Sequence, residues 1–207
     1  MVSGAARLKA TAGRGGRFSI GRNLVSNGRL HLSGPGRIRI GDDCNAWARA
    51  EANVLSTFSP DAVISIGDNV RLNGAGIQAA SAVTIGNDCI LGSCTIVDTD
   101  HHSVDVERRR PGAPVASSPV VVEDNVWIAG MATVLKGVRV GRDSVVGFGA
   151  IVSSDVPAGV VVAGNPARVV RNLYEERAVG ETVGPTENQG STETEDPGAT
   201  KESDTRT

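Results

Sequence analysis

The sequence predicts an all-β protein built as a prism of short parallel strands, and three observations support this prediction. Branched aliphatic residues recur at every sixth position along one stretch: Val122, Ile128, Val134, Val140, Val146 and Val152. Four residues after each of these stands a small or β-branched residue: Val126, Ala132, Val138, Ser144, Ala150 and Val156. Aromatic residues make up only 3% of the chain and glycine occurs 26 times, which favours thin, regular layers of aliphatic side chains.

A period of six matches neither the 3.6 residues of a helical turn nor the simple alternation of a strand. It fits one hexapeptide on each face of a three-sided prism, with the aliphatic residue pointing inward. Each coil then adds one strand spacing of about 4.8 Å along the axis, and each coil contacts only its neighbours. The same frame is expected earlier in the chain, at Ile20, Ile40, Ile66, Leu72, Ile85, Leu91 and Val97.

Two interruptions of the repeat predict irregular segments. The stretch "NVLSTFSPDA", residues 53–62, is expected to contain a loop because the spacing there exceeds that of the hexapeptides. Between Val97 and Val122 the repeat is absent, so residues 103–119 are expected to project from one coil as a loop. Loops that leave a rigid scaffold often carry function.

The repeat and the charge distribution divide the chain into three parts. Residues 1–16 are expected to form a flexible N-terminal segment, and residues 17–174 a single domain. Residues 175–207 hold nine acidic and three basic residues and almost no large apolar side chains, so we expect an acidic disordered tail. The rest of the chain carries a net charge of +4, which is too weak to predict nucleic-acid binding.

Composition also bears on the compartment. No apolar run approaches the roughly 20 residues of a membrane-spanning helix, and the N-terminus lacks the apolar segment of a signal peptide. The three cysteines, Cys44, Cys89 and Cys94, form no CxxC pair and are expected to be reduced thiols. Cys44 and Cys89 follow a repeat isoleucine by four residues, where a small core residue is expected. We therefore expect a cytoplasmic protein without a membrane span.

The block "VWIAGMATVLKGVRVGRDSVVGFGAIVSSDVPAGVVVAGNPARVVR", preceded by "DTDHHSVD", resembles the hexapeptide-repeat acyltransferases. It is similar to the maltose and galactoside O-acetyltransferases and to the sugar acetyltransferases of exopolysaccharide synthesis, strongly over residues 66–171 and more weakly back to residue 20. The resemblance implies a left-handed parallel β-helix and a homotrimer with active sites between subunits. It also implies transfer of an acetyl group from acetyl-CoA to a hydroxyl of a sugar or glycan precursor, without a metal.

Acetyl transfer to a hydroxyl requires a base near neutral pH, and imidazole, with an ordinary pKa of about 6.5, suits this role. The resemblance places the catalytic histidine on His102, in "HSVD". His101 is the alternative, whereas His31 is expected to be an ordinary strand residue. Asp100 is a candidate to orient His102 or to bind the acceptor. Asp98 is expected to be a turn residue that bonds its own backbone.

For coenzyme A, the resemblance implies five contact residues. Trp127 in "NVWIAG" would lie beside the thioester arm, and Ser153 along the pantetheine. Gly130 matches a position whose backbone N–H meets the acetyl end, where it is a plausible oxyanion donor. Arg168 and Arg171 match basic residues near the nucleotide phosphates, which guanidinium groups bind in a bidentate manner.

Three further features have more than one interpretation. Asn73 in "LNGAG" lies one residue away from an acceptor-binding asparagine of the family, and a plain corner residue is the alternative. Phe148 stands where the family commonly has alanine beside the pantetheine, so it is expected to shift or narrow that groove. Residues 108–110, three consecutive arginines, would meet an anionic acceptor or form a solvated basic turn.

Two other functions are open at this point. One is a non-catalytic binding or scaffold protein, which thiol release from acetyl-CoA would contradict. The other is a zinc carbonic anhydrase of the left-handed β-helix type, which needs three histidine ligands and which metal analysis would detect. Adjacent His101 and His102 would not face one metal from a strand, since neighbours point to opposite sides, and His31 lies several coils away. The sequence does not identify the acceptor, which an amino group would also fit.

Overall fold

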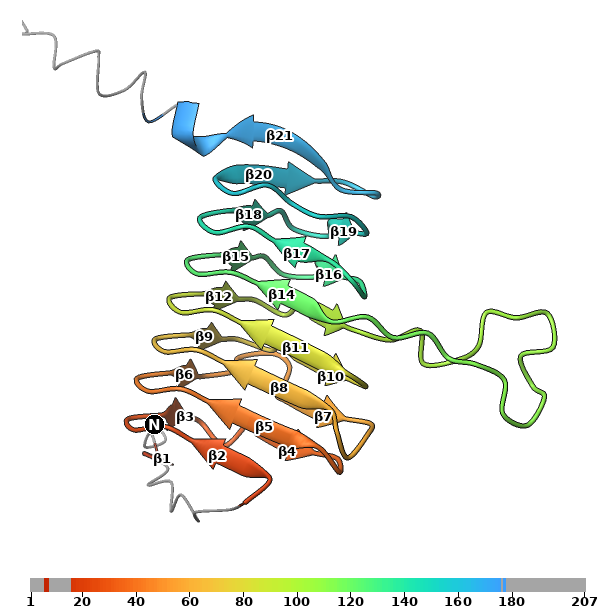
Figure 1. Ribbon diagram of the computed structural model, residues 1–207. Helices are drawn as coiled ribbons and strands as arrows, with labels where there is room; N and C mark the ends of the chain where they lie inside the picture. Colours follow the sequence, from red (N-terminus) through yellow and green to blue (C-terminus); the bar gives the residue numbers. More distant parts are fainter. Residues whose placement is uncertain (1–5, 8–15, 176, 178–207) are drawn as a thin grey trace, which may run out of the picture.

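The structure is a computed structural model of the 207-residue chain, and it describes residues 6–7, 16–175 and 177. The chain winds into a parallel β-solenoid with three faces, and one long loop projects from its side (Figure 1). The predicted all-β, parallel β-helix with a projecting loop is therefore confirmed. The acidic tail apart from residues 175 and 177, and the N-terminal segment apart from residues 6–7 and 16, lie outside the described residues.

Three sheets form the faces, and each coil visits them in the order B, A, C. In spatial order, sheet A contains β1 (Ala6–Arg7), β3 (Val25–Ser26), β6 (Asn45–Ala46), β9 (Arg71–Leu72), β12 (Ile90–Leu91), β15 (Trp127–Ile128), β18 (Val145–Val146), β20 (Val160–Ala163) and β21 (Arg168–Asn172). Sheet B contains β2 (Phe18–Ile20), β5 (Arg37–Ile40), β8 (Val63–Ile66), β11 (Ala82–Ile85), β14 (Val120–Val122) and β17 (Arg139–Val140). Sheet C contains β4 (Leu30–Ser33), β7 (Asn53–Thr57), β10 (Gly76–Ala79), β13 (Thr95–Val97), β16 (Thr133–Val134) and β19 (Ile151–Val152).

The strand pairs are parallel except at the two ends of sheet A. There β1 pairs antiparallel with β3, and β21 pairs antiparallel with β20. Along sheet B the register places repeat residues directly above one another, in the order Ile20, Ile40, Ile66, Ile85, Val122 and Val140. The six-residue period therefore becomes a column of inward-pointing aliphatic side chains.

The core is continuous along the axis and consists of these columns. All six repeat aliphatics from Val122 to Val152, and all six small residues four positions later, are buried. Cys44, Cys89 and Cys94 are also buried in the core, as free thiols. The predicted inward positions of the repeat and of Cys44 and Cys89 are thus confirmed.

The frame predicted at Val97 is wrong. Ile96 is fully buried there and Val97 is only half-buried. Ile96 lies in register between Ile77 below and Val134 above. The corner between Leu91 and Ile96 is one residue shorter than the corner between Ile128 and Val134. The inward position therefore falls one residue earlier than predicted, on Ile96. The loop expected at residues 53–62 is likewise shorter, since β7 occupies its first half.

Candidate active site

A short antiparallel neck, residues 98–100 and 116–118, joins the projecting loop to the solenoid. The Asp100 N–H donates to the Ala116 carbonyl (3.0 Å), and the Ser118 N–H donates to the Asp98 carbonyl (2.8 Å). Thr99 and Ser117 form an isolated antiparallel bridge between these two bonds. Residues 116–118 therefore belong to the neck, and the loop beyond them extends far from the stack (Figure 1).

Asp98 fastens the neck to the coil below. Its side chain is fully buried, and its two carboxylate oxygens accept the N–H groups of Ala80 and Ser81, each at 2.7 Å. A buried carboxylate needs such partners, because burial without hydrogen bonds is costly. The expectation that Asp98 bonds its own backbone is therefore wrong, because its carboxylate accepts the N–H groups of the neighbouring coil.

Asp100 fastens the neck to the coil above. Its Oδ1 lies 2.6 Å from Nζ of Lys136, and both side chains are largely covered. Its carbonyl accepts the N–H of His102 at 2.7 Å. Asp100 therefore positions the backbone of His102, but its carboxylate is bonded to Lys136 and not to the imidazole. Lys136 was not predicted from the sequence, although it is the only lysine between residues 10 and 200.

His101 and His102 follow the neck and line an open pocket of about 390 Å³. The other lining residues are Phe58, Ala80, Thr99 and Val115. Both histidines are exposed, and among the described residues neither imidazole has a hydrogen-bond partner on its ring nitrogens. A ring nitrogen of His102 is thus open to a ligand in this pocket.

His101 is held differently from His102. Its backbone has a φ of 59°, in the left-handed region, and its N–H donates to Oγ1 of Thr99 at 3.2 Å. Its ring meets the ring of Phe58 edge to face, with centroids 5.2 Å apart and planes at 88°. Phe58 was not predicted as a site residue from the sequence, and its contact with His101 bridges two coils.

The residues matched to the coenzyme lie elsewhere on the chain. Trp127 points outward from β15 of sheet A, with half its surface exposed. Gly130 lies at the next corner, between sheets A and C, with the ring of Phe148 against it: a Cβ on Gly130 would lie 3.1 Å from that ring. Ser153 directly follows β19 of sheet C. Arg168 is exposed in β21 and donates to the Ala167 carbonyl at 2.8 Å.

Arg171 also lies in β21, with its side chain exposed. Asn73 lies at a corner between sheets A and C, where its Oδ1 accepts the Arg49 N–H at 3.1 Å. None of these residues lines the histidine pocket, which opens at the corner between sheets C and B. A single chain therefore brings together His102 and Asp100, but it does not bring Asn73 or the coenzyme-matching residues to them.

Two further observations limit the chemistry of the candidate site, and a third concerns membrane-spanning helices. Burial raises the pKa of the Cys89 thiol to about 11 and that of Cys94 to about 12, so neither supplies a thiolate nucleophile near neutral pH. In the described part of the chain, no group of three His, Cys, Asp or Glu side chains is arranged to hold a metal ion. No helix among the described residues is long and apolar enough to cross a membrane.

No family model matches the sequence, but individual proteins do. A candidate acetyltransferase of Saccharomyces cerevisiae is 40% identical over 113 residues, which cover 54% of this chain and 57% of that protein. The chain thus spans little more than half the length of this curated relative.

Two solved structures share the fold at similar identity. One is a hexapeptide-repeat acetyltransferase of Vibrio cholerae complexed with acetyl-CoA, at 29% identity and a TM-score of 0.50, covering 75% of this chain and 70% of that chain. The other is a galactoside acetyltransferase in complex with coenzyme A, at 28% identity and a TM-score of 0.51, covering 78% and 68%. The predicted resemblance to the hexapeptide-repeat acyltransferases is confirmed.

Proposed function

We propose that this chain is an acetyl-CoA-dependent O-acetyltransferase that acts on a hydroxyl of a sugar or glycan precursor. The observation that carries the proposal is the exposed His102, whose ring nitrogens are open beside a pocket at the base of the projecting loop. The similarity to acetyltransferases that bind acetyl-CoA or coenzyme A, one of them acting on galactosides, supports the same conclusion.

In this proposal His102 acts as general base. It removes the proton of the acceptor hydroxyl while the oxygen attacks the carbonyl carbon of the thioester. The tetrahedral intermediate then collapses, the carbon–sulfur bond breaks, and the imidazolium returns the proton to the departing thiolate. Such a base contributes about 10²–10⁴-fold to the rate. The N–H of Gly130 is proposed as a donor to the developing oxyanion.

The site is proposed to form between two chains of a homotrimer. Asn73 and Gly130 lie at corners between sheets A and C, and Trp127 lies on sheet A, whereas His102 lies beyond the far edge of sheet C. A neighbouring chain that presents its own A–C corner to this pocket would supply the acceptor contact of Asn73 and the groove for acetyl-CoA. Trp127, Arg168 and Arg171 are proposed to line that groove, and Ser153, which follows β19 of sheet C, is proposed to contact the pantetheine. Three buried free thiols fit a reducing, cytoplasmic compartment.

The test is release of free thiol from acetyl-CoA with a panel of acceptors: neutral monosaccharides, nucleotide sugars, amino sugars and water alone. We expect acceptor-dependent thiol release and an ester product on a sugar, cleavable by hydroxylamine. Product only on amino groups would replace O-acetylation by N-acetylation. No thiol release with any acceptor would favour the binding or scaffold alternative, and metal-dependent hydration of CO₂ would favour the carbonic anhydrase alternative.

A further inference from the structure

The pocket beside His102 has an aromatic wall that the proposed chemistry does not use. Phe58 follows β7 directly and is held there by its N–H, which donates to the Ala79 carbonyl at 2.8 Å. Its side chain is 53% exposed. A phenyl ring exposed on a corner is an apolar surface in water, and such a surface beside a candidate site points to a ligand.

The pocket exists because a small residue, Ala80, lies on the coil between the rings of Phe58 and His101. Phe58 and His101 lie two coils apart, and Ala80 occupies the corner of the coil between them. The methyl group of Ala80 leaves free the volume that a larger side chain would fill. The edge-to-face contact with His101 fixes one side of the Phe58 ring, and the pocket opens beside it.

The charge of the lining is also informative. None of the six lining residues carries a carboxylate, an ammonium or a guanidinium group. Asp100 on the neck and Lys136 on the coil above it neutralise each other at 2.6 Å. The pocket volume of about 390 Å³ lies at the lower end of the range for small-molecule sites, about 300–1,000 Å³. The site therefore suits a small neutral ring with one apolar face.

We propose that Phe58 is the stacking platform of the acceptor site and takes the C–H face of a neutral pyranose. The face of an aromatic ring carries partial negative charge, and the axial C–H groups of a pyranose carry partial positive charge. Stacking there would leave a hydroxyl at the ring edge directed to His102, on the same pocket wall. This inference rests on the proposed function, of which it specifies the acceptor.

Steady-state kinetics with a neutral pyranoside acceptor test the platform. Phe58→Leu keeps an apolar side chain and removes the aromatic face, whereas Phe58→Trp keeps that face. We expect Phe58→Leu to raise KM for the sugar about tenfold, with kcat and the KM for acetyl-CoA nearly unchanged, and Phe58→Trp to stay near wild type. Val54→Ala, on the outward face of the same strand, is the matched control and should change nothing. An unchanged sugar KM in Phe58→Leu would overturn the inference.

A binding experiment without acetyl-CoA separates this inference from the proposed function. Saturation-transfer NMR with methyl pyranosides should show transfer to the C–H groups of one sugar face in wild type and in Phe58→Trp. The transfer should be lost in Phe58→Leu. Binding of this kind without any turnover would leave the platform standing and refute the acetyltransferase proposal. Turnover of an acceptor without binding at Phe58, or a strict preference for anionic or planar aromatic acceptors, would refute the platform.

Discussion

The two neighbouring histidines illustrate how backbone position can separate residues of the same type. The backbone of His101 is in the left-handed region and its ring packs edge to face against Phe58, so this ring forms part of the pocket wall. His102 is tied through its N–H to the Asp100 carbonyl and has no ring contact of this kind in the described part of the chain. His101 is thus held by packing against Phe58, whereas the ring of His102 is open to a ligand.

Replacement of His102 by alanine should abolish most acetyl transfer without unfolding the protein, because the side chain is exposed and makes no core contact. We expect a fall in kcat of about 10²–10⁴-fold with unchanged binding of coenzyme A, measured by thiol release and by calorimetry. His101→Ala is the matched variant and should retain most of the catalytic rate. The reverse result, an inactive His101→Ala and an active His102→Ala, would assign the base to His101.

Two glycines with positive φ separate two effects of an added side chain on stability. One is the steric overlap of the new Cβ with its neighbours, and the other is the strain of the left-handed backbone conformation. Gly34 has a φ of 100°, and a Cβ there would overlap the Thr57 carbonyl oxygen. Gly28 has a φ of 82° with nothing within 4 Å of such a Cβ. Gly28→Ala should lower the free energy of unfolding by about 1–2 kcal/mol. Gly34→Ala should lower it by about 2–5 kcal/mol, since overpacking adds to the backbone cost. Equal losses in denaturant titrations would show that the corner relaxes freely.

Residue by residue, the sequence predicted those members of the site that a local motif marks. His102 and Asp100 stand in "DTDHHSVD", and both lie at the neck and pocket. Phe58 and Lys136 were missed because their roles depend on which coils stack on the neck. That stacking depends on the length of every corner in between, and the length predicted for the corner after Leu91 is wrong by one residue.

At the scale of elements, the neck is attached to the coil above it by the Asp100–Lys136 ion pair and by a backbone hydrogen bond from the Gly137 N–H to the Ser118 carbonyl. Lys136→Met should remove the contact with Asp100 and loosen the attachment of the loop, while the hydrogen bonds of Asp98 remain. We expect faster hydrogen exchange of the amides of residues 98–102 and 116–118, by about tenfold, and a higher KM for the acceptor. Arg22→Met, which breaks the exposed pair with Asp42 (2.6 Å) at the other end of the molecule, should leave these amides unchanged. Unaltered exchange in Lys136→Met would show that the neck is held by its backbone alone.

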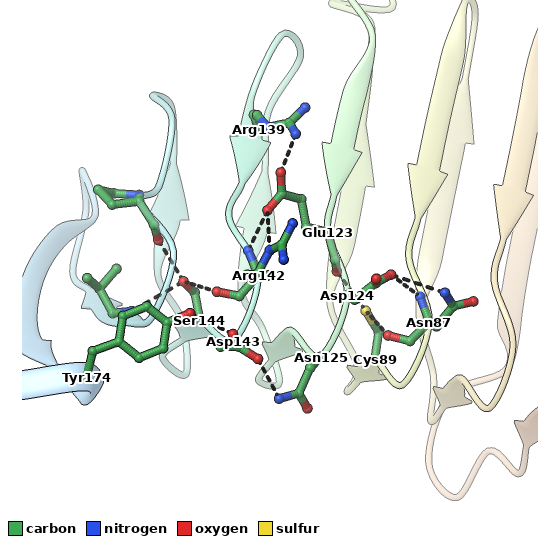
Figure 2. A network of polar contacts seen from close by, with 12 residues as sticks. Asn87, Cys89, Glu123, Asp124, Asn125, Arg139, Arg142, Asp143, Ser144 and Tyr174 are labelled. Carbon is green, nitrogen blue, oxygen red and sulfur yellow. Dashed lines mark hydrogen bonds and ion pairs between the residues drawn. The ribbon is translucent and has the colours of Figure 1, made fainter. Parts of the chain in front are cut away.

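The C-terminal turn is attached to the solenoid by a hydrogen bond whose strength depends on pH. The Tyr174 hydroxyl donates to Oδ2 of Asp143 at 2.6 Å, and the Asn125 amide donates to Oδ1 of Asp143 at 2.8 Å (Figure 2). These two bonds, that of Tyr174 first, lower the pKa of Asp143, and the bond to Asp143 raises the pKa of Tyr174. The contribution of Asp143 is present above the ordinary aspartate pKa of about 3.9 and is lost as pH falls through its lowered value. That of Tyr174 is present below about pH 10 and is lost as pH rises through its raised value.

Tyr174→Phe should therefore lower the melting temperature most between about pH 5 and pH 9. The difference from wild type should shrink as pH falls through the lowered pKa of Asp143 and as pH rises through the raised pKa of Tyr174, because the wild-type bond is then itself lost. The phenyl ring of the variant still covers Gly159, where an added Cβ would overlap the Tyr174 ring, so packing is retained. A melting difference that stays constant while Asp143 is protonated at low pH and Tyr174 is deprotonated at high pH would show that the hydroxyl makes no pH-dependent contribution.

The whole molecule is held together along one corner by side chains that repeat from coil to coil. Between sheets B and A, six residues with positive φ alternate between asparagine and aspartate: Asn23, Asp43, Asn69, Asp88, Asn125 and Asp143. Each asparagine amide donates to the aspartate of the next coil at 2.8 Å. Asparagine and aspartate tolerate the left-handed conformation, and the alternation separates like charges that a spacing of about 4.8 Å would otherwise set side by side.

The repeat explains why the architecture could be predicted and the assembled site could not. A coil contacts only its neighbours, so a local period of six is sufficient to define the core from Val122 to Val152. The site is not periodic. It combines one corner of the solenoid, an inserted loop and, in our proposal, the surface of another chain. The repeat of a single chain does not reveal which surface of a neighbouring chain completes the site.

The two-chain site can be tested by mixing inactive variants. His102→Ala chains lack the base, and Trp127→Ala chains lack the proposed coenzyme contact, which projects from sheet A. If the His102 and the Trp127 of one site come from different chains, a trimer that contains both variants has at least one interface where an intact His102 meets an intact Trp127. Chains dissociated, mixed and reassembled should then recover about a quarter of the wild-type activity, because one interface in four combines two intact partners at random assembly. Separately reassembled variants, mixed only afterwards, are the control and should stay inactive. No recovery from co-assembled chains would place His102 and Trp127 of each site in the same chain, and light scattering that gives a monomer mass for active enzyme would refute the shared site altogether.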